Sequence, residues 1–341
     1  RIHINCVILH NYYNTQLQNL KSMIINKLLN KCLYIAAVSF FLLACSSGAE
    51  NGVDDKPTPP QPEKPTVRIP IGISTSITRV TETAFESGDR IGLYVVNRND
   101  DGSHNDLKSS GNYVDNMRYT YSYNTWTPDE TVYWKDDKTC ADFYLYYPYQ
   151  AAHVNENPMV FKVEADQSNV NSYKNSDVIV GSTMNVAPSQ TTVYIASKHV
   201  MSRVVIALKP GEGFTDASLA ASDVKVTLNI PAVSANIDLA TGKVKPIMSS
   251  DGESLTMTPM TPYKDGNVYR AIVVPQQVSQ TNLINVNVDG RDFVFSKAFD
   301  FVSGKSYTFN VTLAKKSSGL NATITGWDSD GVDYGGTATE E

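Results

Sequence analysis

Cysteine is scarce in this chain of 341 residues, and the positions of the four cysteines are informative. Cys6 and Cys32 fall in an N-terminal segment that we interpret below as a removable leader, and Cys45 is the predicted site of lipid attachment. Cys140 then has no partner within the chain, which excludes an internal disulfide. An exported protein of this kind depends on its hydrophobic cores for stability.

Histidine and the common catalytic motifs are equally scarce. Beyond the leader the histidines are His104, His153 and His199, and none belongs to a metal-ligand or triad pattern. There is no Gly-x-Ser-x-Gly and no Cys-x-x-Cys, and Gly304-Lys-Ser lacks the earlier glycine that a P-loop requires. We therefore predict no enzymatic activity, no cofactor and no metal site. A glycosidase has no motif in its favour, although 35 acidic residues always leave carboxylate pairs to consider.

The N-terminal segment has the organisation of a bacterial lipoprotein leader. The chain does not begin with Met, and residues 1–22 are interpreted as an upstream or mis-called segment. Residues 23–44 combine Lys27 and Lys31 with an apolar run that is too short for a permanent membrane span. The run ends in Leu-Leu-Ala before Cys45, which resembles the lipobox, so Cys45 is predicted to be acylated and held by outer-membrane lipid. The alternative is a buried cysteine in an ordinary signal peptide.

Positive charge is also in short supply once the leader is set aside. Residues 1–44 carry four basic and no acidic side chains, so the remaining 297 residues have 25 basic and 35 acidic ones, a net charge of −10. This balance argues against nucleic acid as a partner and against a basic patch for anionic lipid. Residues 45–66 are rich in proline and are predicted to form an extended tether.

The stretch from Val67 to Arg79 shows the clearest pattern in the chain. Apolar residues fall on alternate positions, as in a strand with one buried face: Val67, Ile69, Ile71, Ile73 and Ile77. Pro70 has no N–H to donate, which predicts a sheet edge. Arg79 follows, where a trypsin-like protease could cleave before Val80. The simpler interpretation is an ordinary first strand followed by a surface arginine.

Many short alternating segments follow, separated by turn residues, and no segment shows the pattern of a long helix. This spacing predicts an all-β protein of stacked antiparallel sheets. We place a boundary between residues 67–198 and residues 199–341, giving two β-sandwich domains in tandem, the second with an acidic tail. Asp100, Asp101, Asp106 and His104 in one loop could suggest calcium, but their spacing favours a solvated hairpin loop.

Aromatic residues are dense between residues 119 and 149. Tyr119, Tyr121 and Tyr123 alternate on one predicted strand, and Trp126 follows closely. Inward-facing rings would fill a β-sandwich, which is the interpretation we favour, whereas exposed rings could stack on sugars. The second interpretation makes the protein a monomeric surface lipoprotein that binds glycan or host protein.

Several motifs, in their order and spacing, resemble the fimbrillin-like (Mfa-like) lipoproteins of type V pili. They cover nearly all of the chain beyond Cys45. The matching segments are Ile77-Thr-Arg-Val-Thr-Glu-Thr, Phe85-Glu-Ser-Gly-Asp-Arg-Ile-Gly-Leu-Tyr, Tyr133-Trp134, Phe143-Tyr-Leu-Tyr-Tyr-Pro-Tyr, His199-Val-Met-Ser-Arg-Val, Ile237-Asp-Leu-Ala-Thr-Gly, Val274-Pro-Gln, Gly304-Lys-Ser-Tyr-Thr-Phe-Asn-Val-Thr-Leu and Ile324-Thr-Gly-Trp.

The resemblance implies two transthyretin-like antiparallel sandwich domains, no enzymatic activity, and assembly of a surface pilus by strand exchange. An arginine-specific protease would cut after Arg79, and another pilin subunit would fill the groove vacated by the first strand. Arg68 and Arg90 are competing cleavage positions. The donor strand would include Ala322, Ile324 and Trp327. The expected location is the outer membrane or cell surface, lipid-anchored or within an extracellular pilus, with adhesion to a host or glycan receptor.

Overall fold

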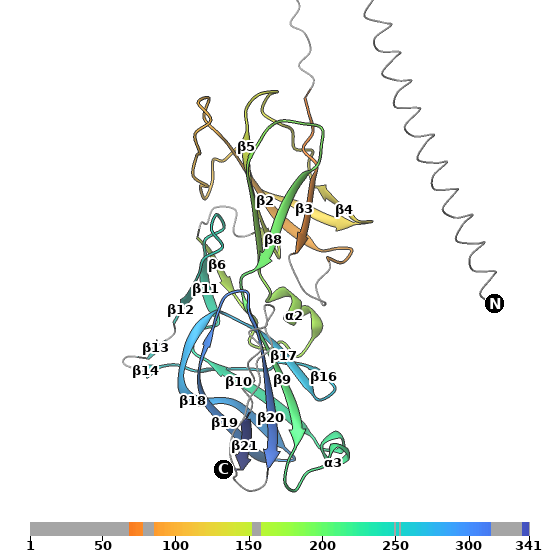
Figure 1. The fold of residues 1–341 in the computed structure, drawn as a ribbon, viewed down its shortest axis with the longest axis vertical. Coiled ribbons are helices and arrows are strands. Elements are labelled where there is room, and N and C mark those ends of the chain that lie inside the picture. The colour runs from red at the N-terminus through yellow and green to blue at the C-terminus, as the bar shows by residue number, and fades with distance from the viewer. Residues whose placement is uncertain are drawn as a thin grey trace, which may run out of the picture. The chain divides into compact units, whose positions relative to one another are not determined.

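The described part of the chain consists almost entirely of β-strands, and the predicted all-β class is confirmed. The computed structural model describes residues 68–77, 85–151, 158–248, 250–251, 254–314 and 336–340 (Figure 1). Two helices of six residues each, α2 (Val170–Asn175) and α3 (Asp216–Ala221), are present in this part. None of the helices described here has the length and apolar character that crossing a bilayer requires.

A seven-stranded sheet contains the first strands of the chain, in the order β1-β8-β7-β5-β2-β3-β4. Their bounds are β1 Ile73–Ile77, β2 Arg90–Asn97, β3 Val114–Ser122, β4 Thr125–Pro128, β5 Ala141–Tyr147, β7 Ile179–Val186 and β8 Val193–His199. Strand β1, the first strand among the described residues, therefore lies at one edge of the sheet, as Pro70 just before it predicts.

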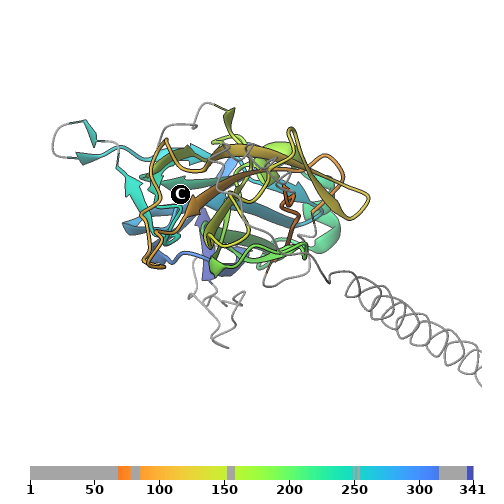
Figure 2. The same ribbon diagram turned by 90° about the horizontal axis from the view of Figure 1, so that it is seen from above.

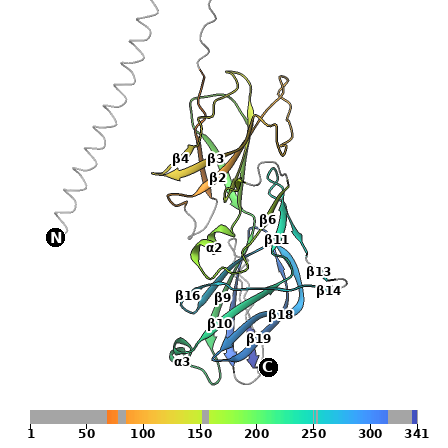
Figure 3. The same ribbon diagram turned by 180° about the vertical axis from the view of Figure 1, so that it is seen from behind.

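A nine-stranded sheet follows, in the order β15-β10-β18-β19-β21-β20-β9-β17-β16. Its strands are β9 Ser202–Pro210, β10 Val224–Ile230, β15 Thr258–Met260, β16 Tyr263–Asp265, β17 Val268–Val273, β18 Gln276–Val288, β19 Arg291–Phe301, β20 Ser306–Ala314 and β21 Gly336–Glu340. Figure 3 shows β10, β18 and β19 side by side from behind, as their pairing requires.

Two smaller sheets complete the fold. One has the order β12-β11-β6 and joins Met159–Lys162 (β6) to Ser234–Ile237 (β11) and Val244–Ile247 (β12). The other is the hairpin of β13 (Ser250–Asp251) and β14 (Ser254–Leu255), which reaches out from the sheets in Figure 2. Because β6 pairs with β11, a strand from before residue 199 contributes to a sheet from after it.

Two central strands, β2 and β5, have both faces buried, which explains why their sequences do not alternate between apolar and polar residues. Leu93 and Phe143 face a core that also contains β1 residues. Tyr94 and Tyr144 face the opposite way and belong to the large core of the nine-stranded sheet. The two cores thus meet across one layer of strands, and the boundary at residue 199 stays a prediction.

Strand direction differs from the expectation at three places. Most pairings are antiparallel, but β1 with β8, β20 with β9, and β20 with β21 are parallel. Parallel neighbours need long connections between them, so local turn residues cannot reveal such pairs. Residues 336–340, within the predicted acidic tail, form strand β21.

Candidate functional site

The segment leading into β1 first pairs with a neighbour on one side. The Ile71 N–H donates to the Val132 carbonyl at 2.8 Å, and the Trp134 N–H donates to the Ile69 carbonyl at 2.9 Å. In this antiparallel pattern the nitrogen of Pro70 faces away from that neighbour. The missing N–H of proline therefore costs no hydrogen bond on this side.

From Gly72 onward the strand pairs on its other side with β8. The Val193 N–H donates to the Gly72 carbonyl at 2.8 Å, and the parallel register runs from Ile73 opposite Val193 to Ile77 opposite Ser197. Pro70 faces the same side as Gly72, so it lies just before the first bond of this ladder. Within Ile73–Ile77 the strand has β8 as its single hydrogen-bonded neighbour in the sheet.

The apolar residues of β1 are held in the core of the first sheet. Ile71 and Ile73 are each 5% exposed, and Ile69 packs against the same core while partly buried. Burial of these two isoleucine side chains stabilises the attachment of the β1 segment to the sheet by about 3–6 kcal/mol. Val67 lies outside the described residues, and only the backbone of Ile77 is described.

Thr75 adds a polar contact to the same face. Its Oγ1 donates to the Ile195 carbonyl at 2.7 Å and lies 2.6 Å from the Oγ of Ser197, which is 1% exposed. The sequence analysis did not single out this threonine. Its alternation with Ile71 and Ile73 was the available signal, because residues two apart in a strand share a face.

The predicted cleavage site, Arg79 and Val80, lies outside the described residues, and so does the predicted lipidation site Cys45. Of the competing arginines, Arg68 is exposed with its guanidinium carbon 4.5 Å from the centre of the Tyr133 ring. Arg90 begins β2, and its carbonyl accepts the Tyr149 N–H at 2.9 Å.

The opposite end of the chain also forms a strand. The candidate donor residues Ala322, Ile324 and Trp327 are outside the described part. The later β21 pairs in parallel with β20, from Val311 opposite Gly336, and antiparallel with β19, where Phe293 is opposite Glu340. A C-terminal strand is therefore held between two neighbours of its own chain.

The aromatic residues are largely core residues, as predicted. Tyr119 is fully buried, Trp126 is 6% exposed, and the Phe85 ring meets Trp126 edge-on with centroids 4.9 Å apart. Tyr123 is the exception, because β3 ends at Ser122 and Tyr123 stands in the turn, 99% exposed with φ 48°. The expectation that Tyr123 continues the face of Tyr119 is therefore wrong.

The acidic loop after β2 is organised by hydrogen bonds within the protein. The buried carboxylate of Asp142 accepts Arg98 Nε at 2.9 Å, and its other oxygen lies 2.8 Å from His104 Nδ1. Burial raises the pKa of Asp142, but the Asn185 N–H and the Arg98 and His104 side chains outweigh that effect and lower the pKa below 3.8. The residues described hold no cluster of three or more candidate metal ligands.

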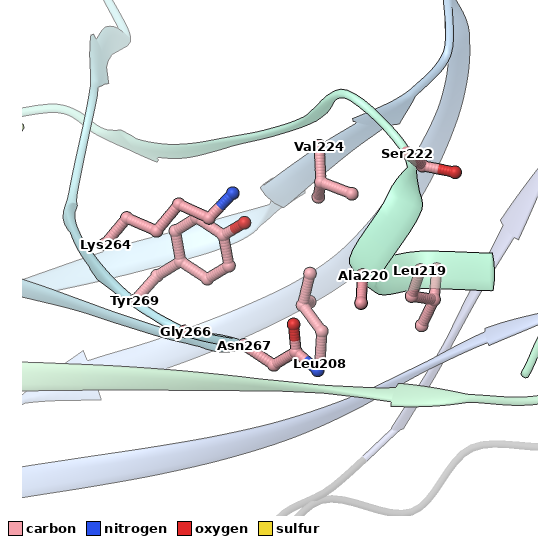
Figure 4. A pocket seen from close by; sticks show the side chains of 9 residues that line it. All are labelled: Leu208, Leu219, Ala220, Ser222, Val224, Lys264, Gly266, Asn267 and Tyr269. Carbon is pink, nitrogen blue, oxygen red and sulfur yellow. The ribbon is translucent and has the colours of Figure 1, made fainter. Parts of the chain in front are cut away.

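A pocket of about 240 Å³ lies in the nine-stranded sheet beside α3 (Figure 4). Leu208, Leu219 and Val224 give it apolar walls, and Lys264 extends over the Tyr269 ring with its Nζ 5.7 Å from the ring centre. No paired acid and base line it, so it offers no arrangement for hydrolysis.

The described residues thus form an all-β protein with an exposed edge strand, and comparisons with known proteins agree with this class. Two crystal structures provisionally named as cell adhesion proteins share the fold. One, from Bacteroides ovatus, has a TM-score of 0.57 at 20% identity and covers 72% of this chain and 92% of its own. The other, from Bacteroides uniformis, has a TM-score of 0.55 at 21% identity, covering 74% and 95%.

Residues 78–327 match the fimbrillin-like family, and the chain belongs to this family. A relative from Bacteroides uniformis, provisionally named fimbrium subunit Fim1C, is 26% identical over 309 residues, which is 87% of this chain and 93% of the relative. The family consists of adhesive and structural proteins and is not known for enzymes.

Proposed function

We propose that this protein is a structural, tip or accessory subunit of a cell-surface type V pilus, and that it receives a strand from another subunit after β1 is removed. The names of the related fimbrial and adhesion proteins support the pilus role. The observation that carries strand exchange is the position of β1. It is the first described strand of the chain and lies at a sheet edge. Few side chains on its inward face hold it to the core, so the strand could be removed without breaking the rest of the sheet.

Arg79 is the cleavage position that best fits this geometry. Cleavage after Arg68 would leave all of β1 attached to the rest of the chain. Arg90 begins a paired strand, and the next residue, Ile91, is fully buried, so a protease could reach that bond only after the sheet had opened. Arg79 stands two residues beyond the end of β1, where one cut separates the whole strand.

The donor strand of this chain lies in its C-terminal region. Ala322, Ile324 and Trp327 remain our candidates for it, and β21 supports the view that this region has strand-forming ability. The six register pairs of β21 are confined to five residues, so its release would break few backbone bonds. Removing it would expose β19 and β20, both strands with deeply buried side chains.

Export and anchoring complete the proposal. Cys45 would carry the acyl chains, the Pro-rich tether would separate the folded part from the outer membrane, and mature subunits would lie at the cell surface or within the pilus. The partners would be other pilin subunits, an arginine-specific protease, outer-membrane lipid and a host or glycan receptor.

The decisive experiment is to identify the N-terminus of the protein recovered from the cell surface, using mass spectrometry of its first peptide. We expect the sequence to begin at Val80. An acylated Cys45 on the assembled protein would show that β1 is retained and would contradict strand removal.

A pair of variants separates cleavage from folding. Arg79→Lys should block an arginine-specific protease while keeping the positive charge, so the protein should reach the surface and stay unpolymerised. Arg90→Lys is the matched control and should assemble normally. Normal fibres from Arg79→Lys would show that the cleavage site lies elsewhere.

A further inference from the structure

The groove that holds the β1 segment contacts two apolar side chains of this segment and one polar side chain. Going along the inward face, Ile71 and Ile73 are buried in the core, and Thr75 is the next residue on that face. The Thr75 hydroxyl makes two contacts of hydrogen-bond length, 2.7 Å to the Ile195 carbonyl and 2.6 Å to Ser197 Oγ. This position therefore differs chemically from the two before it.

The direction of these hydrogen bonds limits which residue can occupy the position. A hydroxyl has one proton, and the Ile195 carbonyl can only accept, so the Thr75 proton goes to that carbonyl. Ser197 Oγ lies 2.6 Å from Thr75 Oγ1 and 3.5 Å from the Ile195 carbonyl, so its proton is best placed toward Thr75 Oγ1, the nearer acceptor. The occupant of this position has to donate and accept through one atom close to the backbone, as the short side chains of threonine and serine do.

The hydroxyl of Ser197 is fixed in place by the strand on its other side. Gly181 of β7 is opposite Ser197, and a Cβ on Gly181 would lie 2.5 Å from Ser197 Oγ and 2.7 Å from the Ala196 carbonyl oxygen. The absence of a side chain at Gly181 makes room for the serine hydroxyl under β1. This glycine is needed for space, because its φ is not in the left-handed region.

From this arrangement we infer that the groove under β1 selects its replacement strand by a hydroxyl. This inference rests on the proposed strand exchange. The fitting strand, in the direction of β1, has aliphatic residues at the positions of Ile71 and Ile73 and threonine or serine at the position of Thr75. A valine there would match threonine in shape but would remove both hydrogen bonds and bury the Ile195 carbonyl without this partner.

The same pattern argues against residues 315–341 as the replacement strand in this groove. Read in the direction of β1, residues 315–341 contain no window in which two apolar residues and then Ser or Thr occupy alternate positions. If Ala322 and Ile324 replaced the two isoleucines, Gly326 would fall at the hydroxyl position. Residues 315–341 of a second copy therefore fit this groove less well than a strand with the aliphatic and hydroxyl pattern.

The test uses the full chain with residues 80–84 replaced by the recognition sequence of a site-specific protease, so that it does not depend on Arg79. After nicking, fluorescently labelled peptides with the sequence of residues 67–77 compete with β1, and anisotropy gives their affinities. We expect the native-sequence and Thr75→Ser peptides to bind similarly. The Thr75→Val peptide should bind about tenfold more weakly, as loss of two hydrogen bonds implies.

Two controls locate the effect in the hydroxyl position. A Ser74→Ala peptide removes a hydroxyl from the opposite face and should bind within about twofold of the native sequence. In a nicked Ser197→Ala protein, the preference for threonine over valine should fall to about threefold, because one of the two bonds is already absent. A peptide of residues 318–328 should bind more weakly than the native-sequence peptide.

Each contrary result has a distinct meaning. Equal or tighter binding of the Thr75→Val peptide would overturn selection by the hydroxyl while leaving strand exchange intact. Equal binding of the residue 318–328 peptide would overturn the inference that residues 315–341 fit this groove poorly. A folded, nicked protein that binds none of the peptides would overturn both this inference and the proposed strand exchange.

Discussion

Strands β1 and β20 are both alternating strands with a parallel neighbour, yet they have opposite positions in their sheets. β1 pairs with β8 over five residues at an edge, whereas β20 pairs with β9 over eight residues and has β21 on its other side. The inward face of β1 includes a hydroxyl contact, whereas Phe309, Val311 and Leu313 of β20 are fully buried. Similar sequence patterns can thus produce a separable strand and a permanent one.

The largest effect is expected in β20. Phe309→Ala removes a fully buried ring that lies against Phe295 and Phe299, with centroids 6.0 and 5.0 Å away. The cavity should lower the free energy of unfolding by about 3–5 kcal/mol. Urea unfolding followed by tryptophan fluorescence would measure it, and a loss below about 1 kcal/mol would contradict the permanent role of β20.

In β1 the expected effect is smaller and local. Ile73→Ala should cost about 2–4 kcal/mol, with the loss concentrated in the attachment of β1. Limited proteolysis should release the N-terminal segment faster while the rest of the fold resists digestion. Ser74 provides a control, because Ser74 lies on the opposite face of β1 and Ser74→Ala leaves the buried face intact. If Ile73→Ala lowered stability uniformly, as measured by hydrogen exchange, the proposed separability of β1 would be wrong.

The strand beneath β1 offers a third comparison. Gly181→Ala places a methyl group against Ser197 Oγ and the Ala196 carbonyl, and should destabilise the protein by about 1–3 kcal/mol. Gly211 is the matched position beside β20, where a Cβ would lie 2.7 Å from the Leu313 carbonyl oxygen. Both variants should lower the unfolding midpoint in urea, but faster proteolytic release of β1 is expected for Gly181→Ala alone.

The first sheet should also respond to acid. The pKa of Asp142 is lower in the folded state than its ordinary value of 3.8, so its contribution to stability is complete well above that value. The contribution is lost as the pH falls below 3.8 toward the folded-state pKa, because the unfolded chain takes up the proton first. Asp142→Asn should flatten this part of the pH profile of unfolding. An unchanged profile between pH 5 and pH 3 would show that other carboxylates dominate.

The smallest effect is expected at Arg68. Its guanidinium lies over the Tyr133 ring at the exposed start of the β1 segment, and Arg68→Ala should cost about 0.5–1 kcal/mol. Arg68→Lys should retain part of that energy. The rate at which β1 is released after nicking measures this effect. A rate increase that corresponds to more than about 2 kcal/mol would mean that this contact is more buried than the structure indicates.

Some features of β1 could be predicted from the sequence and others could not. The alternation of Ile69, Ile71 and Ile73 predicted a strand with one buried face, and Pro70 predicted that it lies at a sheet edge. The same pattern could not reveal that β1 runs parallel to β8, since 115 residues separate the two strands and no turn joins them.

The role of Thr75 was equally hidden. Threonine is common in strands whether it faces inward or outward, and its partners Ile195 and Ser197 are 120 and 122 residues away. Only the pairing of strands brings them together. The alternation of tyrosines continues through Tyr123, but the turn that Tyr123 forms with Asn124, also at positive φ, ends the strand at Ser122.

The doubly buried strands β2 and β5 have a mechanical consequence for a subunit in a fibre. Side chains such as Tyr94 and Tyr144 pack into one core and side chains such as Leu93 and Phe143 into the other, so the two cores meet without a flexible hinge at these strands. Tension entering at the β1 groove would pass through interlocked side chains, which deform little because protein interiors are close-packed. The stiffness of such a fibre would then come from the subunits themselves, and its compliance from the exchanged strands that join them.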